Sequence, residues 1–203
     1  MAGPRPLALF LGTSLTAGLG LDPDSAYTSI LQRKLDSAGI AVRVVNAGAS
    51  GETSAGALRR TAWLLSRDTV ALFVIETGAN DGLRGQDPDS TAANIQGIID
   101  LVRKVRPTPD IALMQMYAVT NLGVPYGRKF GAIFPSLARK NGVELVPFLL
   151  RGVAGIDSLN QNDGVHPNVQ GEKIVAENLW RALEEEFRKA AARNHPNEAH
   201  RRN

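Results

Sequence analysis

Short apolar runs alternate with longer amphipathic segments along most of the chain. The short runs are mostly apolar, and some are rich in β-branched residues, so each predicts a buried strand: Leu7–Leu11, Val42–Val45, Ala71–Ile75, Ile111–Met116 and Glu144–Phe148. The longer segments have their apolar positions at helical spacing and predict helices at Ala26–Ser37, Ser54–Leu65, Thr91–Val105, Arg128–Lys140 and Val169–Ala191. Strands that alternate with helices indicate an α/β fold, in which a parallel sheet lies between two helical layers.

The same pattern predicts a single domain. We expect a three-layer α/β/α domain over residues 1–192 and a polar, frayed tail over residues 193–203. At the helix ends, Asp89–Thr91 is expected to cap the third helix and Pro107 to stop it. Gly39 and Gly142 follow the first and fourth helices, where a residue with left-handed backbone is common.

Composition narrows the class of protein further. The chain has 203 residues, 43% of them hydrophobic, so it can bury a substantial core. No apolar run approaches the roughly 18 residues of a membrane span. Residues 1–6 precede only a strand-length apolar stretch, so we expect no signal peptide in this chain. Localisation stays open, because a periplasmic or secreted protein would have lost such a leader. A net charge of +3 without a basic, aromatic-rich patch argues against nucleic-acid binding, and the lack of cysteine excludes disulfides, thiolate nucleophiles and sulfur-ligated metals.

The glycine-rich turn after the first predicted strand, Gly12 to Gly20, suits either a phosphate loop or a turn that presents a nucleophile. A phosphate loop needs a lysine after its last glycine, and neither that lysine nor the G-x-G-x-x-G fingerprint of dinucleotide binding is present. The G-x-S-x-G nucleophile elbow is absent as well. What remains is Ser14, at the sheet edge where open α/β folds bind ligands. Taken alone, Ser14 is also consistent with a simple helix cap.

One histidine is available to a folded site. His195 and His200 lie in the polar tail, whereas His166 lies three residues after Asp163 and directly before Pro167. Asp163 can therefore hold one ring nitrogen of His166 while the other points outward, the arrangement that orients a catalytic imidazole. The alternative is a loop histidine that is hydrogen-bonded only for structure.

Two further polar segments fall at predicted strand ends. Residues 46–53 (NAGASGET) follow the second strand, and residues 76–82 (ETGANDG) follow the third. Such loops cluster in a doubly wound sheet, so we expect both segments beside Ser14. Glu76 is expected either as a buried acceptor that supports the site or as a solvated residue, and Asp81 as a brace for its loop.

Four blocks, in this order, resemble the motifs of the SGNH (GDSL-type) hydrolase family: FLGTSLTAG, VVNAGASGET, ETGANDGLRG and NDGVHPN. They fall within residues 7–168 and are most similar to those of the bacterial thioesterase I/protease I/lysophospholipase and arylesterase subfamily. The resemblance implies the SGNH hydrolase fold, with a flavodoxin-like, five-stranded parallel sheet. It also implies an enzyme that needs no metal and no organic cofactor.

Carried over position by position, the resemblance implies roles for five residues. Ser14 would be the nucleophile and His166 the general base and acid, with Asp163 orienting His166. The oxyanion hole would consist of the backbone N–H groups of Ser14 and Gly51 and the side-chain amide of Asn80. The substrate would be a small acyl or aryl ester, with thioesters and lysophospholipids as further candidates. We expect a monomer or a small homo-oligomer.

The chain departs from the family at Thr13, where the family motif has an aspartate before the nucleophile. Threonine keeps an oxygen acceptor at this helix N-terminus and loses the charge. We therefore expect the turn and its catalytic chemistry to be retained.

The substrate pocket and the exact function are less constrained. Residues 117–127 and 148–159 are apolar without a regular pattern and are expected to line an acyl pocket or else to pack on the core. Two other functions stay open: a carbohydrate acetylesterase on the same fold, and a non-catalytic lipid- or ester-binding module, which only Thr13 suggests.

Overall fold

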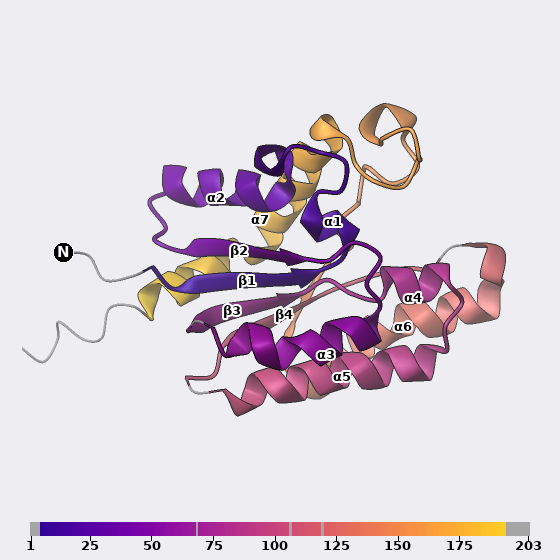
Figure 1. The fold of residues 1–203 in the computed structure, drawn as a ribbon, viewed down its shortest axis with the longest axis horizontal. Helices are drawn as coiled ribbons and strands as arrows, with labels where there is room; N and C mark the ends of the chain where they lie inside the picture. Colours follow the sequence, from indigo (N-terminus) through magenta and orange to yellow (C-terminus); the bar gives the residue numbers. More distant parts are fainter. Residues whose placement is uncertain (1–4, 68, 106, 119, 194–203) are drawn as a thin grey trace, which may run out of the picture.

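Five parallel strands form the centre of the computed structural model, which describes residues 5–67, 69–105, 107–118 and 120–193 (Figure 1). The strands are β1 (Leu7–Gly12), β2 (Arg43–Gly48), β3 (Val70–Ile75), β4 (Asp110–Met114) and β5 (Glu144–Val146). They lie in the order β2-β1-β3-β4-β5, so the direction in which strands are added reverses after β2. This is the flavodoxin-like order, and it confirms the predicted fold class.

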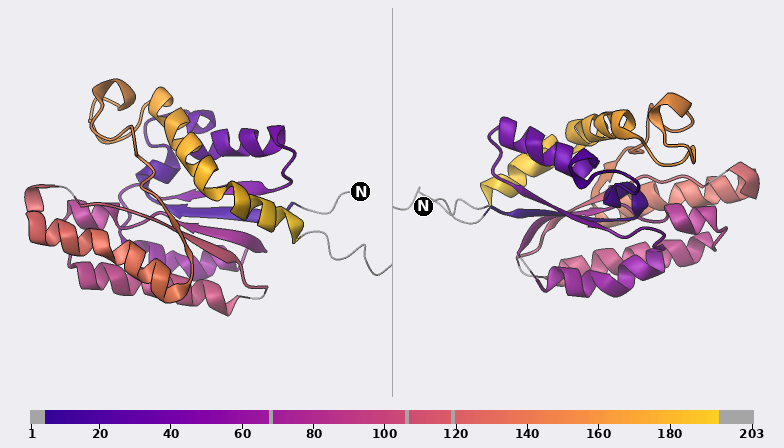
Figure 2. Two further views of the ribbon diagram at one scale, coloured as in Figure 1. Left: turned by 180° about the vertical axis from the view of Figure 1, so that it is seen from behind. Right: turned by 45° about the horizontal axis from the view of Figure 1, so that its top comes forward.

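Helices cover both faces of the sheet. One face carries α2 (Tyr27–Ser37) and α7 (Val169–Ala192), and the other carries α3 (Ser54–Leu65), α5 (Pro88–Lys104) and α6 (Val124–Asn141) (Figures 1 and 2). Two short helices follow strands closely, α1 (Ser14–Ala17) after β1 and α4 (Ala79–Leu83) after β3. Short 3-10 turns occupy Pro23–Ser25, Thr120–Leu122 and Asp157–Leu159.

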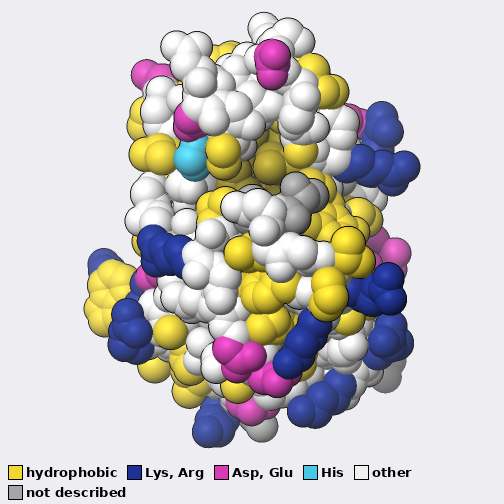
Figure 3. Space-filling view, turned by 90° about the vertical axis from the view of Figure 1, so that its right-hand side faces the viewer, with side chains coloured by type: hydrophobic (Ala, Val, Ile, Leu, Met, Phe, Trp, Pro, Cys, Tyr) yellow, Lys and Arg dark blue, Asp and Glu magenta, His cyan; other side chains and the backbone are white. Residues whose placement is uncertain are grey.

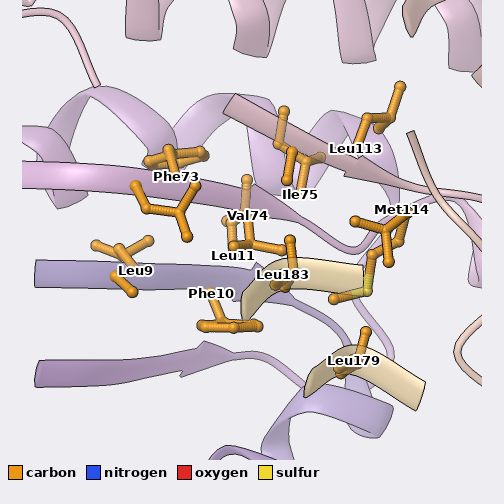
Figure 4. Packing of buried hydrophobic residues seen from close by; sticks show 14 of the residues in the cluster. Leu9, Phe10, Leu11, Phe73, Val74, Ile75, Leu113, Met114, Leu179 and Leu183 are labelled. Atoms are coloured by element: carbon orange, nitrogen blue, oxygen red, sulfur yellow. The ribbon is translucent and has the colours of Figure 1, made fainter. Parts of the chain in front are cut away.

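The hydrophobic core lies between the sheet and the two helical layers. Every residue of β1 and β3 is buried, because the strands are covered on both faces. The Phe10 ring packs edge-on against Tyr27 of α2 and beside Phe187 of α7. Figure 4 shows Phe10 on the same side of the sheet as Leu179 and Leu183. Within the ranges described above, none of the helices combines the length and the apolarity needed to cross a bilayer.

Two helices begin earlier than the sequence predicted. α5 starts at Pro88 and is capped by Asp87, whose carboxylate accepts two backbone N–H groups of the first turn, so the cap predicted at Asp89–Thr91 is wrong. α6 starts at Val124 instead of Arg128. A proline near each start explains both differences, because proline suits the first helical turn, where its missing N–H would have had no partner.

β2 runs to Gly48, three residues past its predicted end at Val45, so residues 46–48 lie in the strand and not in the loop after it. Most other predicted boundaries are closer to the structure. Gly39 and Gly142 have left-handed backbone, with φ of +67° and +58°, as predicted. α5 ends before Pro107. β4 and β5 end earlier than predicted, which leaves Met116 and Phe148 in loops at the carboxyl edge of the sheet.

The last described residue is tied to the sheet. Arg193, where the frayed tail was expected to begin, follows α7, and its guanidinium pairs with Asp110 of β4 at 2.6 Å. Residues 194–203, which include His195 and His200, lie outside the described residues.

Candidate active site

The carboxyl ends of β1, β2 and β3 lie side by side, and the loops that follow them share one edge of the sheet (Figure 1). Gly12 at the end of β1 pairs with Gly48 at the end of β2. Gly12 has no room for a side chain, because a Cβ there would overlap Thr16 of α1. The tight turn that results brings Ser14, the first residue of α1, to this edge.

Three of the predicted site residues form one series of hydrogen bonds. His166 Nε2 lies 2.8 Å from Ser14 Oγ, and His166 Nδ1 lies 2.7 Å from Asp163 Oδ2. Ser14 comes from the turn after β1, whereas the other two come from the loop before α7. That loop is held in place by a hydrogen bond from the Gln161 N–H to the His166 carbonyl oxygen, at 2.7 Å. The structure thus brings together side chains that are far apart in the sequence.

Asp163 is arranged so that it stays charged and holds the His166 ring. Its Oδ1 accepts the backbone N–H groups of His166 and Val165, at 3.0 and 2.9 Å. These hydrogen bonds, those from His166 above all, lower the pKa of the Asp163 carboxyl to about 2. An ionised Asp163 at neutral pH favours a proton on Nδ1 of His166, which leaves Nε2 to accept the Ser14 proton.

The three residues that the family resemblance assigns to an oxyanion hole line the same pocket. Ser14, Gly51 and Asn80 all border the cavity beside His166. Gly51 has φ of +75°, a left-handed conformation that favours glycine. Asn80 Nδ2 donates to the Glu52 carbonyl oxygen at 2.9 Å, which orients the amide and leaves its second N–H available. Among the residues that the structure describes, the backbone N–H groups of Ser14 and Gly51 have no protein acceptor.

A mostly apolar cavity of about 420 Å³ opens beside these groups. Its apolar lining includes Leu15, Leu19, Leu83, Met116, Phe148 and Leu150. Figure 3 shows hydrophobic side chains gathered around a hollow on this face of the molecule. The cavity is of the size that proteins use for small molecules, about 300–1,000 Å³.

The two segments predicted to line a pocket contribute unequally. Residues 148–159 supply Phe148, Leu150, Ala154 and Gly155. Among the described residues of 117–127, Tyr117 alone lines the cavity, and the expectation of an irregular loop is wrong at its end, because α6 begins at Val124.

Sequence reasoning missed other residues that line the pocket. Leu15 follows Ser14, Val165 precedes His166, and Leu83 lies about one helical turn after Asn80. Their positions next to motif residues could have identified them, because the chain neighbours of a residue in a cavity wall often line the same wall.

A buried carboxyl lies directly beneath the turn that carries Ser14. Glu76, just after β3, has no exposed surface, and its Oε2 accepts the Thr13 backbone N–H at 2.7 Å. The hydroxyls of Thr13 and Thr16 donate to the same carboxyl at 3.0 and 2.9 Å. Of the two alternatives predicted for Glu76, the structure therefore shows the buried acceptor and not the solvated residue. Thr13 acts as a donor and makes no side-chain cap, which corrects the acceptor role expected for it.

Two buried carboxyls behind the site titrate near neutral pH. Burial raises the pKa of Glu76 to about 7, although hydrogen bonds from Thr13 and Thr16 oppose the shift. The Thr16 hydroxyl also bonds to the Tyr27 hydroxyl at 2.6 Å, and the Tyr27 N–H donates to Glu172 Oε2 at 2.6 Å. Burial raises the pKa of Glu172 to about 7 as well.

Asp81 braces its loop, as predicted. It is buried, and its carboxylate accepts the Ser54 N–H at 2.8 Å and the Ser54 and Thr91 hydroxyls at 2.5 and 3.3 Å. These bonds tie α4 to the first turns of α3 and α5. Nowhere in the described ranges do three or more His, Asp or Glu side chains gather in a way that could hold a metal ion.

We expect Glu76→Gln to flatten the dependence of stability on pH. The pKa of Glu76 in the folded state is about 7, above its ordinary value of 4.5, so the folded state binds the proton more tightly than the unfolded state. The resulting stabilisation is complete below pH 4.5 and is lost as the pH rises through about 7. A shift of this size corresponds to about 3 kcal/mol. Urea unfolding of wild type and Glu76→Gln between about pH 4 and pH 8 measures the free energy of unfolding, and Glu172→Gln serves as a comparison. If this free energy falls with pH as steeply in Glu76→Gln as in wild type, the expectation is contradicted.

We expect Thr13→Asp to destabilise the protein, increasingly so at higher pH. The Thr13 hydroxyl lies 3.0 Å from both Glu76 oxygens, and two carboxyls at such a distance share one proton. Thr13→Ser keeps the hydroxyl and is the matched control, while Thr13→Asp combined with Glu76→Gln should recover most of the loss. Thermal unfolding on either side of the Glu76 pKa measures the effect. Equal stability of Thr13→Asp and Thr13→Ser at the higher pH would refute the expectation.

Known proteins with similar sequences and structures are hydrolases. Esterase TesA of Pseudomonas aeruginosa is 38% identical over 176 residues, which cover 86% of this chain and 86% of that protein. The thioesterase 1/protease 1/lysophospholipase L1 of Escherichia coli is 35% identical over 176 residues, which cover 87% of this chain and 82% of that protein. The crystal structure of the psychrotrophic esterase EstA from a Pseudoalteromonas species matches with a TM-score of 0.85 and 31% identity, over 89% of this chain and 98% of that one.

A family match covers the same region of the chain. The GDSL-like lipase/acylhydrolase family model matches residues 10–174, a span that begins in β1 and ends in α7. It contains all four sequence blocks that resemble the family. The chain therefore belongs to the GDSL-like lipase/acylhydrolase family, as those blocks predicted, and is a carboxylic ester hydrolase.

Proposed function

We propose that the chain is a serine esterase that hydrolyses small acyl or aryl esters through an acyl-enzyme intermediate on Ser14. The observation that carries the proposal is the hydrogen-bonded series from Asp163 through His166 to Ser14, at the wall of an apolar cavity. A serine hydroxyl is a weak nucleophile, and an adjacent imidazole that accepts its proton activates it.

In the acylation step, Ser14 Oγ forms a bond to the ester carbonyl carbon while His166 Nε2 takes the Ser14 proton. The carbonyl π electrons move to the carbonyl oxygen, which becomes an oxyanion. Asp163 keeps its charge and stabilises the imidazolium across the 2.7 Å hydrogen bond to Nδ1. His166 then gives the Nε2 proton to the alcohol or phenol oxygen as that carbon–oxygen bond breaks.

In the deacylation step, water takes the place of the alcohol. His166 Nε2 removes one proton from the water as the water oxygen attacks the acyl carbon. The same nitrogen returns the proton to Ser14 Oγ when the acyl–serine bond breaks. The products are the carboxylic acid and the free Ser14 hydroxyl, so the cycle closes.

The oxyanion formed in each step needs donors that are already in place. The N–H groups of Ser14 and Gly51 and the Asn80 amide border the cavity and are the groups we assign to this role. Thr13 takes no part in these steps, because its hydroxyl and its N–H are both bonded to Glu76. Threonine in place of the family aspartate is therefore compatible with catalysis.

The lining of the cavity supports acyl or aryl esters over sugar acetates. Tyr117 and Phe148 meet edge to face, with ring centroids 5.2 Å apart, and both border the cavity. Burial of alkyl or aryl groups against such walls contributes roughly 25 cal/mol per Å², whereas sugar hydroxyls would find few partners. The residues of the mechanism all fall between Ser14 and His166, which supports a single catalytic domain over residues 1–192. For the assembly, the proposal stays a monomer or a small homo-oligomer.

Two other functions predict different behaviour. A carbohydrate acetylesterase would release acetate from acetylated xylan or chitooligosaccharides faster than it cleaves simple acyl esters. A non-catalytic binding module would bind lipids or esters without turning them over. Acetate release from acetylated xylan, measured beside the p-nitrophenyl esters below, identifies the first function. Binding without turnover of any ester identifies the second.

We expect the protein to hydrolyse p-nitrophenyl esters, and Ser14→Ala to lower kcat by at least about 1,000-fold. Initial rates on esters from acetate to palmitate measure turnover, and the chain length with the highest kcat/KM gives the effective size of the cavity. Ser66→Ala, at the C-terminal end of α3 and not in the lining of the cavity, is the control and should keep full activity. Turnover that survives in Ser14→Ala would sink the mechanism.

We expect Asn80→Ala to lower kcat about 100- to 1,000-fold with little change in KM, because the oxyanion exists only in the transition state and the intermediates. Asn80→Asp keeps the shape of the side chain but replaces the donor with an acceptor, so its loss should be at least as large. Steady-state kinetics on the preferred ester measures both variants. A rise in KM with kcat intact would instead place Asn80 in ground-state binding.

A further inference from the structure

A largely buried ion pair lies beside the proposed oxyanion hole. Arg60 of α3 contacts the Glu52 carboxylate through Nε, at 2.9 and 2.8 Å, and through Nη2, at 2.7 Å. The Arg60 and Glu52 side chains are 22% and 15% exposed. Charges desolvated to this extent persist only with good geometry and further partners, so the remaining hydrogen bonds of the pair are informative.

Those remaining bonds reach two different loops. Arg60 Nη2 also donates to the Gly12 carbonyl oxygen, 3.1 Å away, two residues before Ser14. The Glu52 backbone carbonyl accepts Asn80 Nδ2 at 2.9 Å. The ion pair thus connects the carboxyl end of β1 with the Asn80 amide of α4. Glu52 itself lies in the loop between β2 and α3.

The peptide unit between Gly12 and Thr13 is held at both ends. Its carbonyl oxygen accepts from Arg60 Nη2 and from the Ala49 N–H, at 3.1 and 2.9 Å. Its N–H donates to Glu76 at 2.7 Å. The next N–H along the chain is the one assigned to the oxyanion, so the orientation of this peptide sets where that donor lies.

Helix α3 leaves space for the ion pair. Gly56 lies one turn before Arg60, and a Cβ at Gly56 would come within 2.7 Å of Glu52 Cγ. Glycine is a much poorer helix former than alanine, so the helix gives up stability at a position where the Glu52 side chain crosses it.

We propose that Arg60 and Glu52 are positioning residues that hold the N–H group of Ser14 and the Asn80 amide in the geometry of an oxyanion hole. The proposal rests on the proposed esterase function. Neither residue lines the cavity, so both act through the backbone and the amide that they fix. Loosened donors weaken binding of the transition state and leave ground-state binding as it was. The expected signature is a fall in kcat with KM unchanged.

Three variants test the proposal. Arg60→Met removes the guanidinium and should lower kcat about 10- to 100-fold, because the donors remain but lose their alignment. Arg60→Lys should lose less, because an ammonium group can still bond to the Glu52 carboxylate or to the Gly12 carbonyl. Gly56→Ala should also lower kcat, although alanine favours the helix, because its Cβ displaces the Glu52 side chain.

The control and the readouts separate positioning from folding. Lys34→Met removes an ion pair to Glu177 (2.9 Å) between α2 and α7, and should keep full kcat. Active sites are counted by mass after labelling with an aryl alkylphosphonate, so kcat refers to competent enzyme only. An alkylboronic acid forms a tetrahedral adduct on Ser14 Oγ, and an oxygen of this adduct accepts hydrogen bonds from the donors of the oxyanion hole. Its Ki should rise in parallel with the loss of kcat, while the Ki of the corresponding alcohol stays constant.

The outcomes are distinguishable. If wild type neither turns over esters nor takes the label, the proposed function fails. If wild type does both, and Arg60→Met and Gly56→Ala keep the wild-type kcat per labelled site and lose only thermal stability, the ion pair is merely structural and the positioning role is overturned.

Discussion

The strands β1, β2 and β3 end side by side, and the distances in the active site depend on that register. Gly12 lies opposite Gly48, and Leu11 lies opposite Ile75, so the three following loops begin at the same level of the sheet. A slip of one residue would move a loop by about 3.3 Å and turn its side chains to the other face. The 2.8 Å contact between His166 and Ser14 would not survive such a slip.

The sheet edge that carries the proposed active site also concentrates buried polar groups, whose desolvation is costly. Glu76 is wholly buried with a pKa near 7, and the Arg60 and Glu52 side chains are only 22% and 15% exposed. Each of these groups is tied to a backbone atom of the active-site loops. The apolar strands beneath them supply the stability that permits this arrangement, since β1 and β3 are buried along their whole length. In this account, buried and partly buried polar groups hold the proposed reacting groups in position.

The layers of the fold and the motif residues can be predicted from the sequence. The hydrogen bonds and ion pairs between distant residues cannot. Buried strands are apolar on both faces, so their runs are visible without a structure, and the four blocks locate Ser14 and His166. The helices α1 and α4 are too short to show a period, and both were missed. That Thr13 donates to Glu76, 63 residues away, depends on the pairing of β1 with β3, which no local pattern encodes. The Arg60–Glu52 pair escaped notice for a similar reason, because its link to Gly12 exists only once α3 has packed on the sheet.

The central claim is that Ser14 is the nucleophile, activated by His166. Reaction with an aryl alkylphosphonate followed by peptide mass mapping tests it most directly. We expect one adduct per chain, on the peptide that contains Ser14. His166→Ala should react far more slowly, and Ser14→Ala should carry no adduct. An adduct on another residue, or ester hydrolysis that continues without any adduct, would contradict the account.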